Sequence, residues 1–249
     1  MSNWPEGYAK RVLAEVDSTL DEAKRIAPGL AGPEWILGLK QTKGRGRRGR
    51  DWKDPKGNFA GTLVMRPEGD PEQAALRSFV AALALYDACA EVAGRSEGLA
   101  LKWPNDVLLN GGKVAGILLE SVGAGQGVNH LIIGIGVNLV AAPGAGQVEQ
   151  GAVPPVSLLS ETGIRVSPEE FLDLLAAAYD RHETQFTTYG FAPIRTAWLR
   201  DAARLGETIT ARTTAETMTG RFESIDEAGN LILTTAKGQR AIPAADIFF

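Results

Sequence analysis

Residues 112–140, GKVAGILLESVGAGQGVNHLIIGIGVNLV, decide the fold of this chain. Two long apolar runs, residues 113–122 and 128–140, are joined here by the Gly-rich residues 123–127. Runs rich in Val, Ile and Leu on either side of a short glycine-containing segment are typical of paired antiparallel strands. The segment therefore predicts a β-hairpin.

Further strands and helices are predicted on both sides of this hairpin. Apolar and alternating runs predict strands over residues 35–40, 58–66, 99–103 and 107–109. Thr19-x-x-Glu22 fits a capping box that begins a helix at Ser18 or Thr19, and Pro28-Gly29 ends it. Caps and helical spacing predict further helices from Asp70 to near Gly94, over residues 171–186 after the cap Ser167, and over residues 193–203.

The pattern changes after Gly206 to short alternating runs, at residues 208–213, 217–225 and 231–235, with a turn at 226–230. Such runs predict a small SH3-like β-barrel. The expected fold class is therefore α+β, with a central mixed β-sheet and packed helices in residues 1–203 and the barrel in residues 204–249.

Composition limits the chemistry that the chain can perform. The 249 residues are 44% apolar, which is enough for a core, and no run reaches the length of a membrane span or signal peptide, so we expect a cytoplasmic protein. Cys89 lies in an apolar helical run and is expected to be buried, and His130 and His182 are expected to be structural or on the surface. The remaining polar groups favour electrostatic stabilisation of a charged transition state.

Residues 40–53 form a basic segment in an acidic chain. They hold seven Lys or Arg and one acid, Asp51, whereas the formal net charge of the whole chain is −4. Alternating glycines let the backbone adopt many conformations, and guanidinium groups offer forked donors to phosphate and carboxylate oxygens. The segment predicts a loop that orders around an anion. A solvated basic loop and an RGG-like nucleic-acid contact remain open as alternatives.

Four blocks carry a family resemblance when they are read in series. They are GRGRRGR at 44–50, KWPND at 102–106, GKVAGILLE at 112–120 and GIGVNL at 134–139, and Asp17-Ser18-Thr19 precedes them. In this order they closely resemble the biotin protein ligases, from about Ala14 to the C-terminal barrel. The resemblance implies a biotin/lipoate ligase-like catalytic domain. It also implies that biotin and ATP give biotinyl-5′-AMP and pyrophosphate, and that a lysine of a carrier domain then attacks the adenylate to form an amide.

The resemblance also implies a set of site residues. The expected contacts to biotin are Ser18, Thr19, Leu20, Gln41, Arg45, Gly46, Arg47, Lys113 and Gly116. The expected contacts to ATP or the adenylate are Arg47, Arg48, Trp52, Asn105, Lys113 and Asn138. The expected catalytic residues are Lys113, Arg45 and Asp106. Leu20 stands where the family frequently has Asn, so a backbone group is expected to serve there. No protein ligand for a metal is assigned, since Mg²⁺ prefers phosphate oxygens and few protein ligands.

Two of these residues have roles with a direct physical reason. The carboxylate of biotin and the α-phosphate of ATP repel each other, and a fixed ammonium at Lys113 reduces that repulsion. A carboxylate at Asp106 can orient the incoming carrier lysine and favour loss of its proton.

The expected partners follow from the same resemblance. The first is the biotin carboxyl carrier protein or domain of a biotin-dependent carboxylase. The second is another copy of the chain, because family members often pair through an edge of the central sheet. Neither nucleic acid nor a membrane is expected as a partner. Only 17 residues precede Ser18, which is too short for the DNA-binding module of members that double as repressors. Two alternatives remain, a lipoate-protein ligase and a nucleic-acid-binding protein that uses the basic loop and Trp52.

Overall fold

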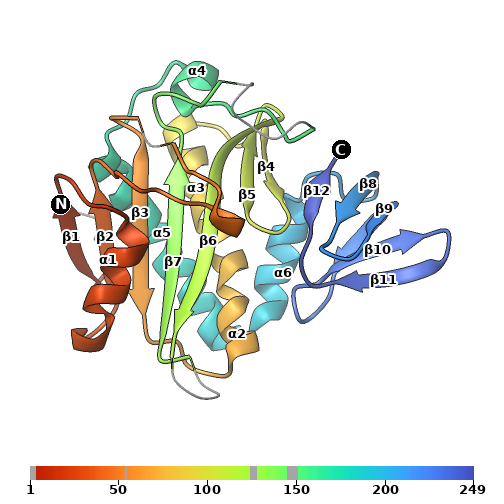
Figure 1. Cartoon of the computed structure of the whole chain (residues 1–249), viewed down its shortest axis with the longest axis horizontal. Helices are drawn as coiled ribbons and strands as arrows, with labels where there is room; N and C mark the ends of the chain where they lie inside the picture. Colours follow the sequence, from red (N-terminus) through yellow and green to blue (C-terminus); the bar gives the residue numbers. More distant parts are fainter. Residues whose placement is uncertain (1–3, 54, 124–127, 145–150) are drawn as a thin grey trace.

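The computed structural model of the chain describes residues 4–53, 55–123, 128–144 and 151–249. Its main sheet is formed by β1 (Ala9–Leu13), β2 (Glu34–Gly38), β3 (Phe59–Met65), β4 (Leu99–Lys102), β5 (Asp106–Leu109), β6 (Gly112–Val122) and β7 (His130–Val137). The helices are α1 (Thr19–Ile26), α2 (Pro71–Ala75), α3 (Arg77–Ala93), α4 (Leu158–Thr162), α5 (Pro168–Tyr189) and α6 (Phe191–Arg200). Figure 1 shows the sheet with α1 on one face and α3 and α5 on the other.

The predicted hairpin lies within this sheet. Strands β6 and β7 are antiparallel with Gly116 opposite Gly136, and β3 pairs with the other edge of β7. The strand order is β1-β2-β3-β7-β6-β5-β4, and only the β1–β2 pair is parallel, so the sheet is mixed as predicted. Residues 124–127 of the predicted connection lie outside the described part of the chain.

The two faces of the sheet are covered by different helices because successive strand residues point to opposite sides. Ile36 and Val64 pack with Leu20 of α1, whereas their neighbours Trp35 and Leu63 belong to the main core with α3 and α5. Strands β2 and β3 are consequently buried along their whole length. Both faces of the sheet centre are thus fixed by packing.

The first two predicted helices differ from the structure in detail. The helix expected from Asp70 to Gly94 begins and ends there, with Asp70 accepting a bond from the Gln73 amide and Gly94 left-handed, but it is divided at Leu76 into α2 and α3. The capping box at Thr19 is wrong. Ser18 is the N-cap of α1 but makes no side-chain cap bond, and Glu22 pairs with Arg25 instead.

The cap at Ser167 is confirmed, and the structure adds a capping box in which Glu170 accepts a bond from the Ser167 amide. Helix α5 begins three residues before and ends three residues after the predicted 171–186. Helix α6 begins and ends two to three residues before the predicted 193–203. Strand β1 and helix α4 were not predicted from sequence.

Cys89 is fully buried, which raises the pKa of its thiol to about 12.

The C-terminal residues form a second, five-stranded antiparallel sheet, consistent with the predicted SH3-like fold. Its strands are β8 (Thr208–Arg212), β9 (Thr217–Ile225), β10 (Leu231–Thr235), β11 (Gly238–Ile242) and β12 (Asp246–Phe248), in the order β11-β10-β9-β8-β12. Trp103 of the main unit donates a hydrogen bond to Gly229 in the β9–β10 turn, at 3.1 Å. This bond links the β9–β10 turn to the KWPND block, and Figure 1 shows the C-terminal sheet beside α6.

Among the described residues, no helix combines the length and the hydropathy needed to cross a membrane.

Candidate active site

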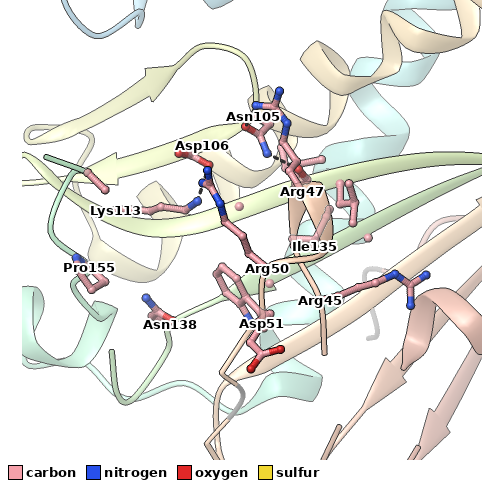
Figure 2. Close-up of a pocket in the computed structure, with 18 of the residues that line it drawn as sticks. Arg45, Arg47, Arg50, Asp51, Asn105, Asp106, Lys113, Ile135, Asn138 and Pro155 are labelled. Carbon is pink, nitrogen blue, oxygen red and sulfur yellow. Dashed lines mark hydrogen bonds and ion pairs between the residues drawn. The ribbon is translucent and has the colours of Figure 1, made fainter. Parts of the chain in front are cut away.

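A cavity of about 530 Å³ opens between the basic loop, the β6–β7 strands and the end of the C-terminal sheet. Its lining contains every site residue predicted above except Ser18 and Arg48. These two lie beside it, Ser18 fully buried next to Arg45 and Arg48 against the C-terminal sheet. The four sequence blocks, far apart in the chain, thus meet at one cavity (Figure 2).

An ion pair between Lys113 and Asp106 lies in this cavity. Lys113 is in β6 and Asp106 begins β5, and their Nζ and Oδ1 atoms are 2.7 Å apart. Asp106 Oδ1 is buried, and a carboxylate oxygen has two lone pairs, so it can accept a further hydrogen bond beside this ion pair. A Cβ at Gly116 would lie 3.3 Å from the Lys113 ammonium and 3.6 Å from Asp106 Oδ1. Glycine at 116 therefore leaves room for the pair.

Lys102 is a second ammonium at Asp106 that the sequence analysis did not single out. Its Nζ lies 3.9 Å from Asp106 Oδ2, and the residue is buried at the cavity wall. Burial lowers the pKa of Lys102, an effect that the charge of Asp106 opposes. The position of Lys102 within the KWPND block was the available signal. Together these residues place two cations around one carboxylate.

A chain of hydroxyl and amide groups forms another wall of the cavity. The Thr19 amide and hydroxyl both donate to Gln41 Oε1, at 2.9 and 3.1 Å, and the Thr62 hydroxyl donates to that of Thr19 at 2.8 Å. Beside them Leu20 packs over Gly134, where an added Cβ would lie 2.6 Å from Leu20 Cδ2. This wall therefore combines a fixed polar edge with an apolar surface.

Trp52 lies flat against the hairpin because Gly136 has no side chain. A Cβ at Gly136 would come 2.7 Å from Trp52 Nε1, and the Lys113 ammonium lies 5.9 Å from the centroid of the indole ring. Asn138 is 2% exposed and donates to Val156 O, while its Oδ1 has no hydrogen-bond partner among the described residues. An aromatic surface and a buried acceptor therefore line the same side of the cavity.

The arginines of the basic loop point in different directions. Arg47 donates to Asn105 Oδ1 at 3.3 Å, and Asn105 Nδ2 is held by Ile117 O at 2.6 Å. Burial lowers the pKa of Arg47 from its ordinary value. Arg45 instead extends away from Lys113 and Asp106 (Figure 2), and pairs with Asp21 of α1 at 2.7 Å and with Glu120 of β6 at 3.1 Å.

Asp246 of β12 is a site residue that sequence reasoning missed. It lines the cavity and pairs with Arg48 and, at 3.3 Å, with Arg50. No local pattern could have revealed it, since 196 or more residues separate these partners.

Among the described residues, no group of three or more His, Cys, Asp or Glu is arranged to hold a metal ion.

Two family descriptions match the chain. Residues 12–138 match the biotin/lipoate A/B protein ligase family, and residues 205–249 match the biotin protein ligase C-terminal domain.

Individual relatives give the same assignment. The biotin–[acetyl-CoA-carboxylase] ligase of Paracoccus denitrificans is 61% identical, over 96% of this chain and 99% of that protein. The bifunctional ligase/repressor BirA of Bacillus subtilis is 33% identical, over 93% of this chain and 71% of that protein. A structure of biotin protein ligase from Aquifex aeolicus in complex with biotin and ATP is similar in fold, with a TM-score of 0.79 and 24% identity over 96% of this chain and 97% of that one. The chain therefore belongs to the biotin/lipoate A/B protein ligase family, among its biotin–[acetyl-CoA-carboxylase] ligases.

Proposed function

We propose that this ligase activates biotin with ATP in the cavity around Lys113 and then transfers it to a lysine of a carboxylase carrier domain. The observation that carries the proposal is the Lys113–Asp106 pair at 2.7 Å, set between the basic loop and the polar wall at Thr19 and Gln41. A cavity of about 530 Å³ is within the usual range of ligand pockets.

In the first half-reaction a carboxylate oxygen of biotin attacks the α-phosphorus of ATP, and the bond to pyrophosphate breaks. The barrier is largely electrostatic, because two anions must meet. Lys113 and Arg47 supply fixed positive charge at that junction, where little reorganisation is needed. Mg²⁺ carried on the phosphates would neutralise the leaving pyrophosphate. The nearby Lys102 adds a third cation on the same wall.

The biotin end of the cavity is assigned to the Thr19–Gln41 wall. A buried donor or acceptor that is left unpaired costs about 1–3 kcal/mol, so fixed polar groups select a ring with matching polar atoms. Ser18 holds Arg45 at 3.4 Å beside this wall. The amide of Leu20 lies in the first turn of α1, where helical amides have no intrahelical acceptor. Leu20 can therefore contact the ligand through its backbone while its side chain packs on Gly134.

The adenylate end is assigned to the wall formed by Trp52, Asn105 and Asn138. The indole offers a flat surface for the nucleotide, and the buried Asn138 Oδ1 requires a donor, which a ribose hydroxyl or an amino group would supply. Asn105 fixes Arg47 rather than standing free in the cavity. Gly46 brings the loop backbone close to the ligand, and Arg48 acts from outside the cavity.

In the second half-reaction the carrier amine attacks the acyl carbon, the bond to the phosphate oxygen breaks, and AMP leaves. An amine is nucleophilic only after loss of its proton, which Asp106 is placed to accept. Asp106 Oδ1 can accept a hydrogen bond from this amine.

The remaining assignments are also proposals. We propose a cytoplasmic enzyme that acts on a biotin carboxyl carrier protein and divides into a catalytic domain at 1–203 and a C-terminal domain at 204–249. The C-terminal family match at 205–249 supports that division. A homodimer through an outer strand of the main sheet, β1 or β4, is testable by analytical ultracentrifugation.

The test is carrier modification by the purified protein with Mg²⁺, ATP and biotin. We expect a mass increase of one biotinyl group on a carrier domain, and none on a variant in which the target lysine is Arg. Modification with lipoate instead of biotin would contradict the substrate assignment. No modification, together with salt-sensitive binding of DNA or RNA, would reassign the basic loop to nucleic acid.

A further inference from the structure

The basic loop is tied to the rest of the protein by carboxylates at both of its ends. Arg45, at the beginning, pairs with Asp21 and Glu120, and Arg48 and Arg50, at the end, pair with Asp246. The arginine between them, Arg47, is directed to Asn105 in the cavity.

The first attachment joins the loop to α1 and β6. Glu120 Oε2 lies 3.1 Å from Arg45 Nη2 and 2.7 Å from Lys24 Nζ, and Arg45 Nη1 lies 2.7 Å from Asp21 Oδ2. The Arg45 and Glu120 side chains are only 25% and 23% exposed, so solvent screens the pair less than it screens most surface pairs. Arg45 thus holds the loop beside the polar wall of the cavity.

The second attachment joins the loop to the C-terminal sheet. Asp246 lies opposite Arg212 in the β12–β8 pair, so its backbone position is fixed by strand pairing. Its carboxylate is 14% exposed and accepts from Arg48, Arg50 and Arg212. Burial alone would raise the pKa of Asp246, but Arg48 and Arg50 outweigh it and hold the pKa below its ordinary value. Asp246 is therefore charged at neutral pH.

We infer that Asp246 and Glu120 are positioning residues that hold the basic loop closed over the cavity from its two ends, so that Arg47 faces the reacting groups. The consequence for the reaction rests on the proposed function, because a closed loop keeps water from the mixed anhydride and retains the adenylate. The C-terminal sheet thereby acts on the chemistry through the loop.

Hydrogen–deuterium exchange of residues 43–53, measured without any ligand, tests this directly. Asp246→Asn and Glu120→Gln are expected to speed exchange of that segment at least about fivefold, because each removes charge-assisted hydrogen bonds. Asp246→Glu keeps the carboxylate and should remain near wild type. Glu223→Gln, which removes the partner of Arg221 elsewhere in the C-terminal sheet, is the matched control.

A second readout, release of the adenylate, distinguishes the positioning role of Asp246 and Glu120 from the proposed ligase function. Release of pre-formed biotinyl-5′-AMP should be faster in Asp246→Asn and Glu120→Gln than in Glu223→Gln. Exchange at residues 43–53 that equals wild type, or a rise spread evenly over the whole chain, would overturn the inference. If exchange at residues 43–53 is faster in the variants but the wild-type protein forms no adenylate, the proposed function is refuted. The positioning role of Asp246 and Glu120 would then still hold.

Discussion

The Lys113 ammonium and the Asp106 carboxylate meet at 2.7 Å across neighbouring strands β6 and β5, beside a glycine at 116 that leaves space for both. The strands fix the backbone of each residue, so the charges are held in place before substrates arrive. Such preorganised charge is the main source of electrostatic catalysis.

Lys113→Ala is expected to slow adenylate formation by about 10²- to 10³-fold, the usual effect of removing one preorganised charge or donor. The measurement is single-turnover formation of biotinyl-5′-AMP. Lys237→Ala, which removes an exposed lysine between β10 and β11, is the control and should keep the wild-type rate. Equal rates in the two variants would remove Lys113 from the mechanism.

Asp106→Asn is expected to act mainly on the second half-reaction. Transfer from pre-formed adenylate to the carrier lysine should slow by about 10²- to 10⁴-fold, the range for a positioned general base. Adenylate formation should change less, because Asn is similar in size to Asp and the Lys113 ammonium remains. The two steps are separated by adding carrier to enzyme that already holds the adenylate. Normal transfer after slowed activation would contradict the role given to Asp106.

Gly136→Ala is expected to weaken ATP binding by about tenfold, since stacking of a base on an aromatic ring contributes about 1–3 kcal/mol. The added methyl group would lie 2.7 Å from Trp52 Nε1 and must displace the indole. Isothermal titration with ATP, compared with biotin, should show the loss for ATP alone. Gly29→Ala, where an added Cβ meets nothing within 4 Å, is the control. Unchanged ATP affinity would show that Trp52 does not contact the nucleotide.

Cys89 is expected to stay unreactive in the folded protein. Complete burial raises the pKa of its thiol to about 12, so the reactive thiolate is scarce from pH 7 to about pH 9. Thiol titration should detect Cys89 only after denaturation, and activity should survive alkylating reagents. Rapid labelling of the native enzyme at pH 8 would contradict the structural role of Cys89.

The parts of the fold that sequence predicted are those with local signals. The hairpin of β6 and β7 shows continuous apolar runs, and the caps at Asp70 and Ser167 act within three residues of the helix start. The strand β1 has no such signal, because it is an edge strand of sequence AKRVL whose paired residues in β2 lie 25 positions further along the chain.

The failed capping box at Thr19 has a tertiary cause. The spacing Thr19-x-x-Glu22 fits a capping box, but the Thr19 hydroxyl instead donates to Gln41 and accepts from Thr62. Arg45 donates to the Ser18 hydroxyl. Tertiary contacts also define the role of Asp246, because its partners Arg48 and Arg50 come from the other end of the chain. Local pattern could identify the blocks of the site, but not the contacts that depend on how the blocks fold together.

ATP–pyrophosphate exchange with Mg²⁺, comparing biotin, lipoate and no added acid, tests the central claim most directly. We predict exchange with biotin alone, and its loss in Lys113→Ala. Exchange with lipoate, or none with either acid in a folded preparation, would contradict the assignment of this cavity to biotin adenylation.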